Sequence, residues 1–231
     1  RSASRTTDPL LGKTVLGFRV LSFVGSGSSS RVYKAENAEG VPAAIKVLNP
    51  EFRDHPGMRA SFLREAEVTD SLAHPSVLRV FECGKTDDGS MCLAIEYFDG
   101  VPLASLTSMR TPVPPERAVT MMLHVVSALG ALHHAGYVHR DVNPENILFR
   151  ETPEGDDVKL CDFGHAAAPE DRAEPSLSAI PDYMAPELAE SISADARSDI
   201  YACGVMLFEL LTGTLPTGDS PSICARAPEV S

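Results

Sequence analysis

The sequence predicts an α+β fold of two lobes, in which an antiparallel β-sheet with one helix is followed by a mainly helical lobe. The chain has 231 residues, enough to bury a core as one large or two small lobes. Apolar runs bounded by turn residues fill the first half, and after residue 99 the apolar spacing changes from that of strands to that of helices. We therefore divide the chain into a tail (1–11), a sheet lobe (12–98) and a helical lobe (99–231).

Five runs in the first half have the composition of strands, because β-branched and apolar residues dominate them. Turn residues that tolerate left-handed backbone angles separate the second run from the third at 37–40, and the fourth from the fifth at 87–89. The predicted strands are 18–24, 31–35, 41–48, 77–83 and 91–97.

Three segments are predicted to be helices. Residues 58–72 carry apolar positions at spacings of four and three, and residues 116–134 continue such a pattern after two prolines. Residues 200–211 are apolar on nearly every side, which indicates a helix at the centre of its lobe, with Ser198 as N-cap and Gly213 as stop. The apolar positions that mark the second helix are Val119, Met122, Leu123, Val126, Leu129 and Leu132.

Composition excludes several classes of function. The formal net charge is −12, so attraction to phosphate backbones is a poor basis for binding, and we expect no nucleic-acid partner. No apolar run approaches the length of a membrane-spanning helix, so we expect no membrane segment in these residues. Five cysteines without a CxxC pair predict reduced thiols and a cytoplasmic location.

Gly25-Ser26-Gly27 lies between two predicted strands, where a bare backbone can approach phosphates closely. An ordinary Gly/Ser hairpin explains these residues equally well. A dinucleotide-binding fingerprint is excluded, because Ser30 stands where its third glycine belongs and a strand follows instead of a helix.

Charged and amide residues follow at fixed positions. Lys46 lies at the end of an apolar strand, where a buried ammonium needs a carboxylate partner, and Glu65 on the first helix can supply it. Such a pair can also be purely structural. Asp141 and Asn146 lie five residues apart, and Asp162 opens the triplet Asp-Phe-Gly. Their oxygens suit magnesium and general-base chemistry on phosphates.

These motifs, with Ala185-Pro186-Glu187, occur in the order and spacing of one family. Over residues 11–216 the chain resembles the eukaryotic-type protein serine/threonine kinases. Within that family it is most similar to the members found in bacteria. The resemblance implies the bilobal kinase fold, ATP and Mg²⁺ as cofactors, a protein substrate and a serine/threonine-kinase activity. Only fifteen residues follow Pro216, so we expect the last helices of the helical lobe to be missing.

The resemblance also implies a role for each motif residue. Lys46, held by Glu65, would contact the α- and β-phosphates, and Asp141 would orient the substrate hydroxyl and accept its proton. Asn146 and Asp162 would hold magnesium. Gly25 and Gly27 would cover the triphosphate, Val32, Ala44 and Leu148 would enclose the adenine, Ile95 would line the back of its pocket, and Glu96 and Phe98 would belong to the hinge that binds it.

Two departures from the family lie beside Asp141. Asn143 replaces a lysine that points at the transferring phosphate, and Ile180 replaces the threonine that usually bonds that lysine. An active but slow kinase remains our first hypothesis, because the lysine, base and metal positions are retained. A nucleotide-binding pseudokinase that acts as a scaffold is the alternative, and a small-molecule phosphotransferase is disfavoured by the Ala185-Pro186-Glu187 segment.

Overall fold

A computed structural model describes residues 8–169, 181–189, 194–217 and 223. The chain forms two compact units. The first comprises Arg1–Asp70 and Arg79–Phe98, and the second comprises Ser71–Leu78 and Asp99–Ser231. The segment Ser71–Leu78 thus belongs to the second unit, although the division drawn from the sequence assigned it to the sheet lobe.

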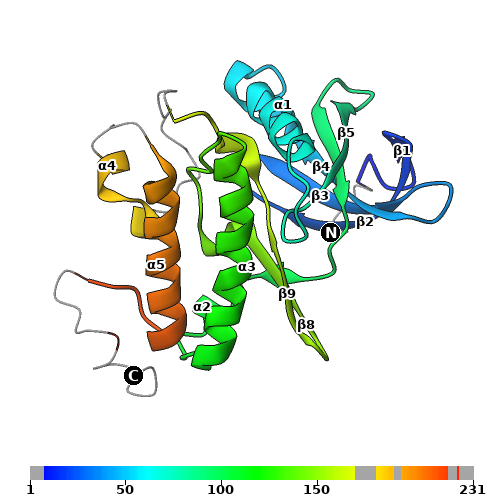
Figure 1. Cartoon of the computed structure of the whole chain (residues 1–231). Helices are drawn as coiled ribbons and strands as arrows, with labels where there is room; N and C mark the ends of the chain where they lie inside the picture. The colour runs from blue at the N-terminus through cyan, green and yellow to red at the C-terminus, as the bar shows by residue number, and fades with distance from the viewer. Residues whose placement is uncertain (1–7, 170–180, 190–193, 218–222, 224–231) are drawn as a thin grey trace, which may run out of the picture. The chain divides into compact units, whose positions relative to one another are not determined.

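The first unit is an antiparallel sheet with the strand order β1-β2-β3-β4-β6-β5 and one long helix, α1 (Figure 1). All five predicted strands exist, but the fourth begins at Val80, because Val77 forms only an isolated parallel bridge with Leu160 of the second unit. The helix predicted at 58–72 begins and ends two residues earlier. The elements are β1 Thr14–Val15, β2 Phe18–Ser26, β3 Ser30–Glu36, β4 Pro42–Leu48, the 3₁₀ turn η1 Pro50–Phe52, α1 Pro56–Asp70, β5 Val80–Lys85 and β6 Met91–Glu96.

This sheet buries both faces, each in a different way. On one face Tyr33, Ile45 and Cys92 pack in a cluster that β1 covers with Val15. On the other face Leu48 and Leu93 pack with Phe62 of α1, among other residues. Because successive side chains of a strand alternate between faces, Lys46, two residues before Leu48, projects on the face that α1 covers.

The second unit is mainly helical, and the long helices α3 and α5 lie side by side in it (Figure 1). This unit also contains a small antiparallel sheet with the strand order β7-β8-β9. No helix in the described ranges is long and apolar enough to cross a membrane. The elements are β7 Val101–Pro102, α2 Ala104–Thr107, α3 Pro115–His134, the 3₁₀ turn η2 Pro144–Asn146, β8 Ile147–Thr152, β9 Gly155–Leu160, the 3₁₀ turns η3 Phe163–His165 and η4 Pro181–Tyr183, α4 Pro186–Ala189 and α5 Ala196–Thr212.

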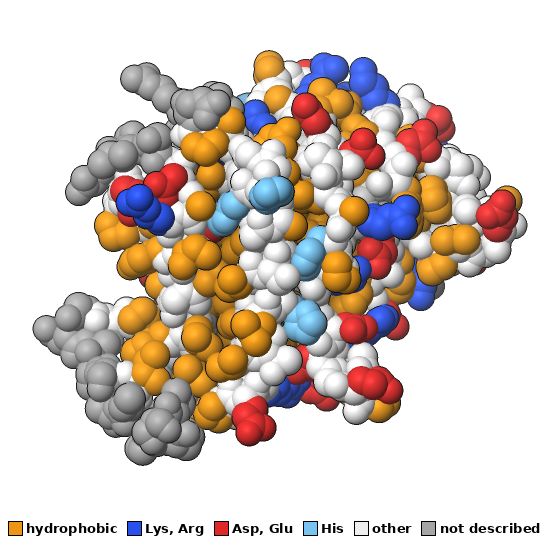
Figure 2. Space-filling model, viewed as in Figure 1, with side chains coloured by type: hydrophobic (Ala, Val, Ile, Leu, Met, Phe, Trp, Pro, Cys, Tyr) orange, Lys and Arg blue, Asp and Glu red, His pale blue; other side chains and the backbone are white. Residues whose placement is uncertain are grey.

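Helix α3 carries two apolar stripes, and only one of them is buried. Met122, Leu129 and Leu132 lie in the core as their spacing predicted, whereas Val119, Leu123 and Val126 are exposed. Figure 2 shows hydrophobic side chains gathered over α3 and α5. Periodicity identified the helix correctly, but it could not tell which apolar stripe a neighbouring element covers.

Helix α5 begins and ends with distinct caps. Its N-cap is Asp195, whose Oδ1 accepts a hydrogen bond from the Arg197 N–H, so the prediction of Ser198 as N-cap is wrong. Ser198 instead donates its hydroxyl to Glu187 Oε1 at 2.9 Å. Gly213 ends the helix as predicted, with a φ of 72° that favours glycine. The prediction of a helix buried on nearly every side was too strong, because Ile200 and Tyr201 are exposed.

Candidate active site

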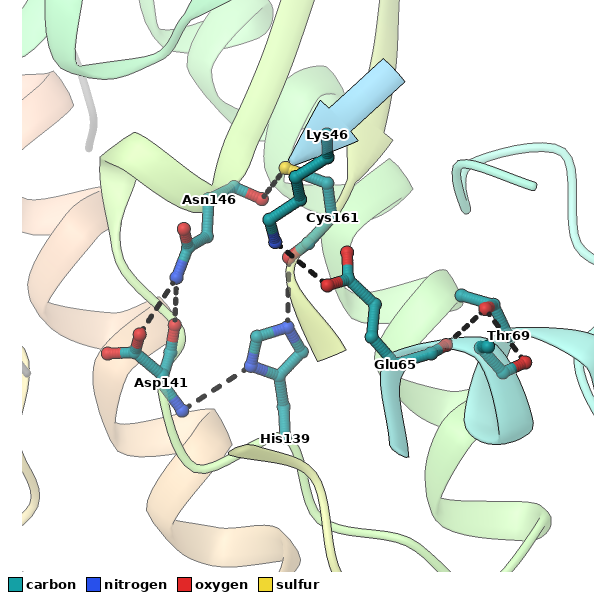
Figure 3. Close-up of polar contacts among 8 residues, drawn as sticks. Lys46, Glu65, Thr69, His139, Asp141, Asn146 and Cys161 are labelled. Carbon is teal, nitrogen blue, oxygen red and sulfur yellow. Dashed lines mark hydrogen bonds and ion pairs between the residues drawn. The ribbon is translucent and has the colours of Figure 1, made fainter. Parts of the chain in front are cut away.

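In the sheet unit, Lys46 of β4 and Glu65 of α1 form an ion pair, with Lys46 Nζ 2.8 Å from Glu65 Oε2 (Figure 3). The two side chains are 13% and 7% exposed, so water screens their attraction only weakly. The Phe62 ring lies 5.5 Å from the ammonium. The Thr69 hydroxyl, one turn further along α1, donates to the carbonyl of Glu65. The pair predicted from the sequence therefore forms within one compact unit.

The hairpin between β2 and β3 is held by a hydrogen bond from the Gly27 N–H to the Ser30 carbonyl at 2.9 Å. A Cβ atom built on Gly25 would meet no atom within 4 Å, and one on Gly27 would only reach the Ser30 carbonyl at 4.0 Å. Neither glycine has a positive φ. Packing within the described structure therefore does not require glycine at these positions, which leaves the backbone accessible to a ligand.

The residues predicted to enclose adenine in this unit share one face of the sheet. Val32 pairs directly with Lys46 across β3 and β4, and Ala44 pairs with Ile95 across β4 and β6. Glu96 ends β6, where its N–H donates to the Arg79 carbonyl at 2.8 Å. Phe98 is the last residue of the unit.

In the helical unit, a loop after α3 carries Asp141, and Asp199 of α5 anchors that loop. The N–H groups of His139 and Arg140 each donate to one carboxylate oxygen of Asp199 at 2.9 Å. His133 Nε2 lies 2.7 Å from the same carboxylate, which is 1% exposed. Asp199 therefore braces the loop through its backbone, and Arg140 in this loop has a left-handed conformation with a φ of 69°.

His139 is fully buried and binds the backbone of Asp141. Its Nδ1 accepts the Asp141 N–H at 3.3 Å, so Nε2 carries the proton that is donated to the Cys161 carbonyl at 3.2 Å. The ring also packs on Phe163, with centroids 5.0 Å apart. His139 and Phe163 are thus packed against each other beneath the loop, and the contacts of His139 are structural.

Asp141 and Asn146 are brought together by a tight turn, η2 (Figure 3). Asn146 Nδ2 donates to the Asp141 carbonyl at 2.8 Å and to Asp141 Oδ2 at 3.1 Å. With its nitrogen engaged in this way, the amide directs its oxygen away from Asp141 (Figure 3). An amide oxygen is a hard ligand of the kind that magnesium binds.

Asn143 does more in the structure than its sequence interpretation allowed. We predicted only the loss of a cation, yet Asn143 Nδ2 donates to the carbonyl and to Oδ1 of Asp141, both at 3.1 Å. Its own Oδ1 accepts the Glu145 N–H at 3.0 Å. The tripeptide Asn-Pro-Glu was a signal for this cap, because Asn before proline often begins a helical turn. Ile180, the second departure, lies outside the described residues.

Asp162 follows β9 and has a left-handed conformation with a φ of 63°. The preceding residue, Cys161, donates its N–H to the Asn146 carbonyl at 3.0 Å and its thiol to the same oxygen at 3.3 Å. These two bonds place Asp162 beside Asn146. Leu148, the adenine-contacting residue predicted in this unit, lies in β8 opposite Lys159.

The donor set beside Asn146 fits magnesium bound together with a phosphate ligand. Among the described residues, no group of three or more His, Cys, Asp or Glu side chains could hold a metal ion alone. Magnesium commonly keeps several waters and binds one or two carboxylates plus substrate phosphates. One carboxylate, that of Asp162, and the amide oxygen of Asn146 agree with that mode of binding.

A cavity of about 250 Å³ in the sheet unit is separate from these residues. It lies on the face opposite α1, between the segment around Leu10, β1 and the β5–β6 turn. None of the predicted site residues lines it. Cavity volume therefore does not identify the candidate site, and the polar contacts do.

Comparison with known proteins agrees with this geometry. A family model described as "Protein kinase domain" matches residues 18–226. Serine/threonine-protein kinase pkn2 of Myxococcus xanthus is 36% identical over 206 residues, which are 86% of this chain and 25% of that protein. PrkC of Bacillus subtilis is 34% identical over 212 residues, 90% of this chain and 32% of that protein.

The solved kinase domain of Mycobacterium tuberculosis PknI matches with a TM-score of 0.73 and 30% identity, over 95% of this chain and 85% of that one. The chain spans between 25% and 40% of the length of the first curated relatives. The predicted fold, an antiparallel sheet with one helix and a helical second unit, is thereby confirmed. The chain belongs to the protein kinase family and is related to bacterial serine/threonine kinases.

Proposed function

We propose that this chain is an active protein serine/threonine kinase domain that transfers the γ-phosphate of Mg-ATP to a protein hydroxyl. The observation that carries the proposal is the arrangement of Asp141. Amide N–H groups hold its carboxylate in one orientation, and two bonds leave acceptor capacity on a group with about four lone-pair sites. A substrate hydroxyl can use that capacity.

The sheet unit supplies the nucleotide-binding groups. Lys46 carries a positive charge to the α- and β-phosphates, and Glu65 fixes its ammonium by the 2.8 Å ion pair. The open backbone at Gly25 and Gly27 covers the triphosphate. Val32, Ala44 and Ile95, which share one sheet face, offer adenine an apolar surface, and the backbone of Glu96 and Phe98 provides its hydrogen bonds.

The helical unit supplies the groups for chemistry. Asp141 orients the substrate hydroxyl and accepts its proton as the oxygen attacks the γ-phosphorus. Asp162 and Asn146 would hold magnesium, which would supply positive charge to offset the negative charge of the phosphates. Asp199 keeps the loop in place through backbone hydrogen bonds.

A nucleotide-binding pseudokinase is the second candidate, and Asn143 is the observation that favours it. The amide donates to Asp141 but brings no positive charge to the transferring phosphate. One preorganised charge at a transition state is worth roughly a hundredfold or more in rate. We therefore expect a slow enzyme whose nucleotide binding is intact.

Transfer of ³²P from ATP to a basic general protein substrate, with magnesium, separates the two candidates. Parallel titration with a fluorescent ATP analogue measures binding without chemistry. If the proposal is correct, the parent chain transfers phosphate and the Asp141→Asn variant does not. Binding of Mg-ATP without any transfer would establish the pseudokinase.

We also propose a cytoplasmic location and a protein as the second substrate. The reduced thiols expected from the cysteine pattern, and the need for ATP, favour a reducing compartment that contains nucleotide. None of the four cysteines that the structure describes is in a disulfide: Cys83, Cys92, Cys161 and Cys203. Cell fractionation with an antibody to the native protein tests the location.

A further inference from the structure

We propose that Asn143 is a positioning residue for the Asp141 carboxylate, so that this chain orients its catalytic base with two neutral amides. The inference rests on the kinase function proposed above and deepens it. The contacts of Asn143 are with Asp141 and Glu145, so we assign it a role that acts through Asp141. Its role is therefore alignment of the base without any direct stabilisation of the transferring group.

The amide of Asn143 is fully engaged, and its contacts fix its orientation. Nδ2 donates to two acceptors of Asp141, and Oδ1 accepts from the Glu145 N–H. Exchange of the amide oxygen and nitrogen would turn all three contacts into donor–donor or acceptor–acceptor pairs. The side chain is 3% exposed, so water cannot replace the lost bonds.

The two amides bind the two oxygens of the Asp141 carboxylate at equal distances. Asn143 Nδ2 lies 3.1 Å from Asp141 Oδ1, and Asn146 Nδ2 lies 3.1 Å from Oδ2. Both amides also donate to the Asp141 carbonyl. Since each carboxylate oxygen is held by its own donor, rotation of the carboxylate breaks at least one bond on a residue that is 6% exposed.

The tripeptide Asn-Pro-Glu alone does not account for this arrangement. The same tripeptide, Asn-Pro-Glu, begins the 3₁₀ turn η1 at Asn49, but that asparagine makes no side-chain cap hydrogen bond. Asn143 makes the cap and the Asp141 bonds together. The difference is that Asp141 stands two residues before Asn143 and offers an acceptor.

Asn143→Asp tests the donor and the cap separately. Aspartate has nearly the same shape and still accepts the Glu145 N–H, but it replaces the donating nitrogen with an oxygen that repels Asp141. Asn37→Asp is the matched control, because Asn37 is a half-buried turn residue whose Oδ1 only accepts hydrogen bonds, from the Glu39 and Val41 N–H groups. Both variants add one negative charge.

Single-turnover transfer, ATP affinity and the thermal unfolding midpoint are measured for each. We expect Asn143→Asp to slow transfer roughly 10- to 100-fold with ATP affinity unchanged, because the base is misaligned while the nucleotide groups are intact. Asn37→Asp should behave as the parent. If Asn143 served only as the N-cap of η2, Asn143→Asp would transfer phosphate as fast as the parent.

A swapped double variant, Asp141→Asn with Asn143→Asp, provides a readout that needs no activity. Asn143→Asp should lower the unfolding midpoint, and the swap should restore it, since one amide again donates to one carboxylate. If Asn143→Asp matches Asn37→Asp in rate and midpoint, the positioning role is overturned while the kinase function stands. If the parent transfers no phosphate although the swap restores the midpoint, the kinase function fails, and the contact is structural only.

Discussion

The two units hold their functional carboxylates in different ways. In the sheet unit, Glu65 is paired with a full positive charge on Lys46. In the helical unit, Asp141 is held by two side-chain amides, and Asp199 by two backbone N–H groups and the His133 ring. Under the proposed function, the difference separates two tasks: the ion pair would bring charge to a phosphate, whereas the neutral donors would align a base or a loop without neutralising it.

The largest expected effect separates binding from chemistry at Asp141. Asn in place of Asp141 keeps the shape but cannot accept the substrate proton, so transfer should fall by about 10²- to 10⁴-fold. ATP affinity should remain nearly that of the parent, because the phosphate and metal groups are untouched. Asp162→Asn should lower both quantities. Equal losses of ATP affinity in the two variants would show that Asp141 serves the nucleotide and would erase the distinction between the units.

A somewhat smaller effect is expected at the ion pair. Lys46→Met should slow transfer by about 10²- to 10³-fold and also weaken ATP binding, since the cation contacts phosphate in the ground state and the transition state alike. The matched control is Lys85→Met, an exposed lysine of β5 in the same sheet. ATP titration of both variants checks the expectation. Unchanged ATP affinity in Lys46→Met would reduce the pair to a structural bridge.

A fourth carboxylate, that of Glu209, extends the comparison to stability. Glu209 of α5 is buried and accepts the Tyr183 hydroxyl at 2.5 Å. Burial raises the pKa of Glu209, and the Tyr183 hydrogen bond opposes that rise only in part. The pKa of a glutamate in the unfolded chain is about 4.3. Between that pH and the higher pKa of the folded state, the folded protein binds more protons than the unfolded chain. Glu209 therefore lowers the free energy of unfolding as the pH rises through this range.

Urea unfolding between pH 4 and 7 measures the Glu209 effect. Glu209→Gln should flatten the pH dependence, and Tyr183→Phe should cost about 1–3 kcal/mol at neutral pH, because the buried carboxylate loses its donor. A Glu209→Gln variant with the parent's pH dependence would show that this carboxylate does not contribute to it.

The smallest effects concern glycines of the two units. A Cβ on Gly213 would meet the Arg110 carbonyl oxygen at 2.7 Å, and its φ is 72°, so Gly213→Ala should destabilise the fold by about 1–2 kcal/mol. Gly25→Ala has open space and should leave stability unchanged while it weakens ATP binding. Thermal unfolding and ATP titration of both variants check this contrast. Loss of stability in Gly25→Ala would mean that this glycine serves packing.

The sequence alone determined the elements and most of the site. Turn residues and apolar spacing predicted five of the six strands of the larger sheet and the three long helices, because side-chain periodicity is a local property. The order and spacing of Lys46, Glu65, Asp141, Asn146 and Asp162 identified the family. Local signals also predicted that Gly213 ends α5, since a left-handed cap depends on the residue that adopts it.

The tertiary structure decided which of several possible partners each side chain contacts. Val119 and Leu129 are equally apolar, and only packing determines that one is exposed and the other buried. Ser198 and Asp195 are both good caps, and the presence of Glu187 diverts the Ser198 hydroxyl. Asn143 looked like a lost cation, whereas the fold of its loop turns the amide onto Asp141. In each case a side chain has several possible partners, and the folded chain brings one of them within hydrogen-bonding or packing distance.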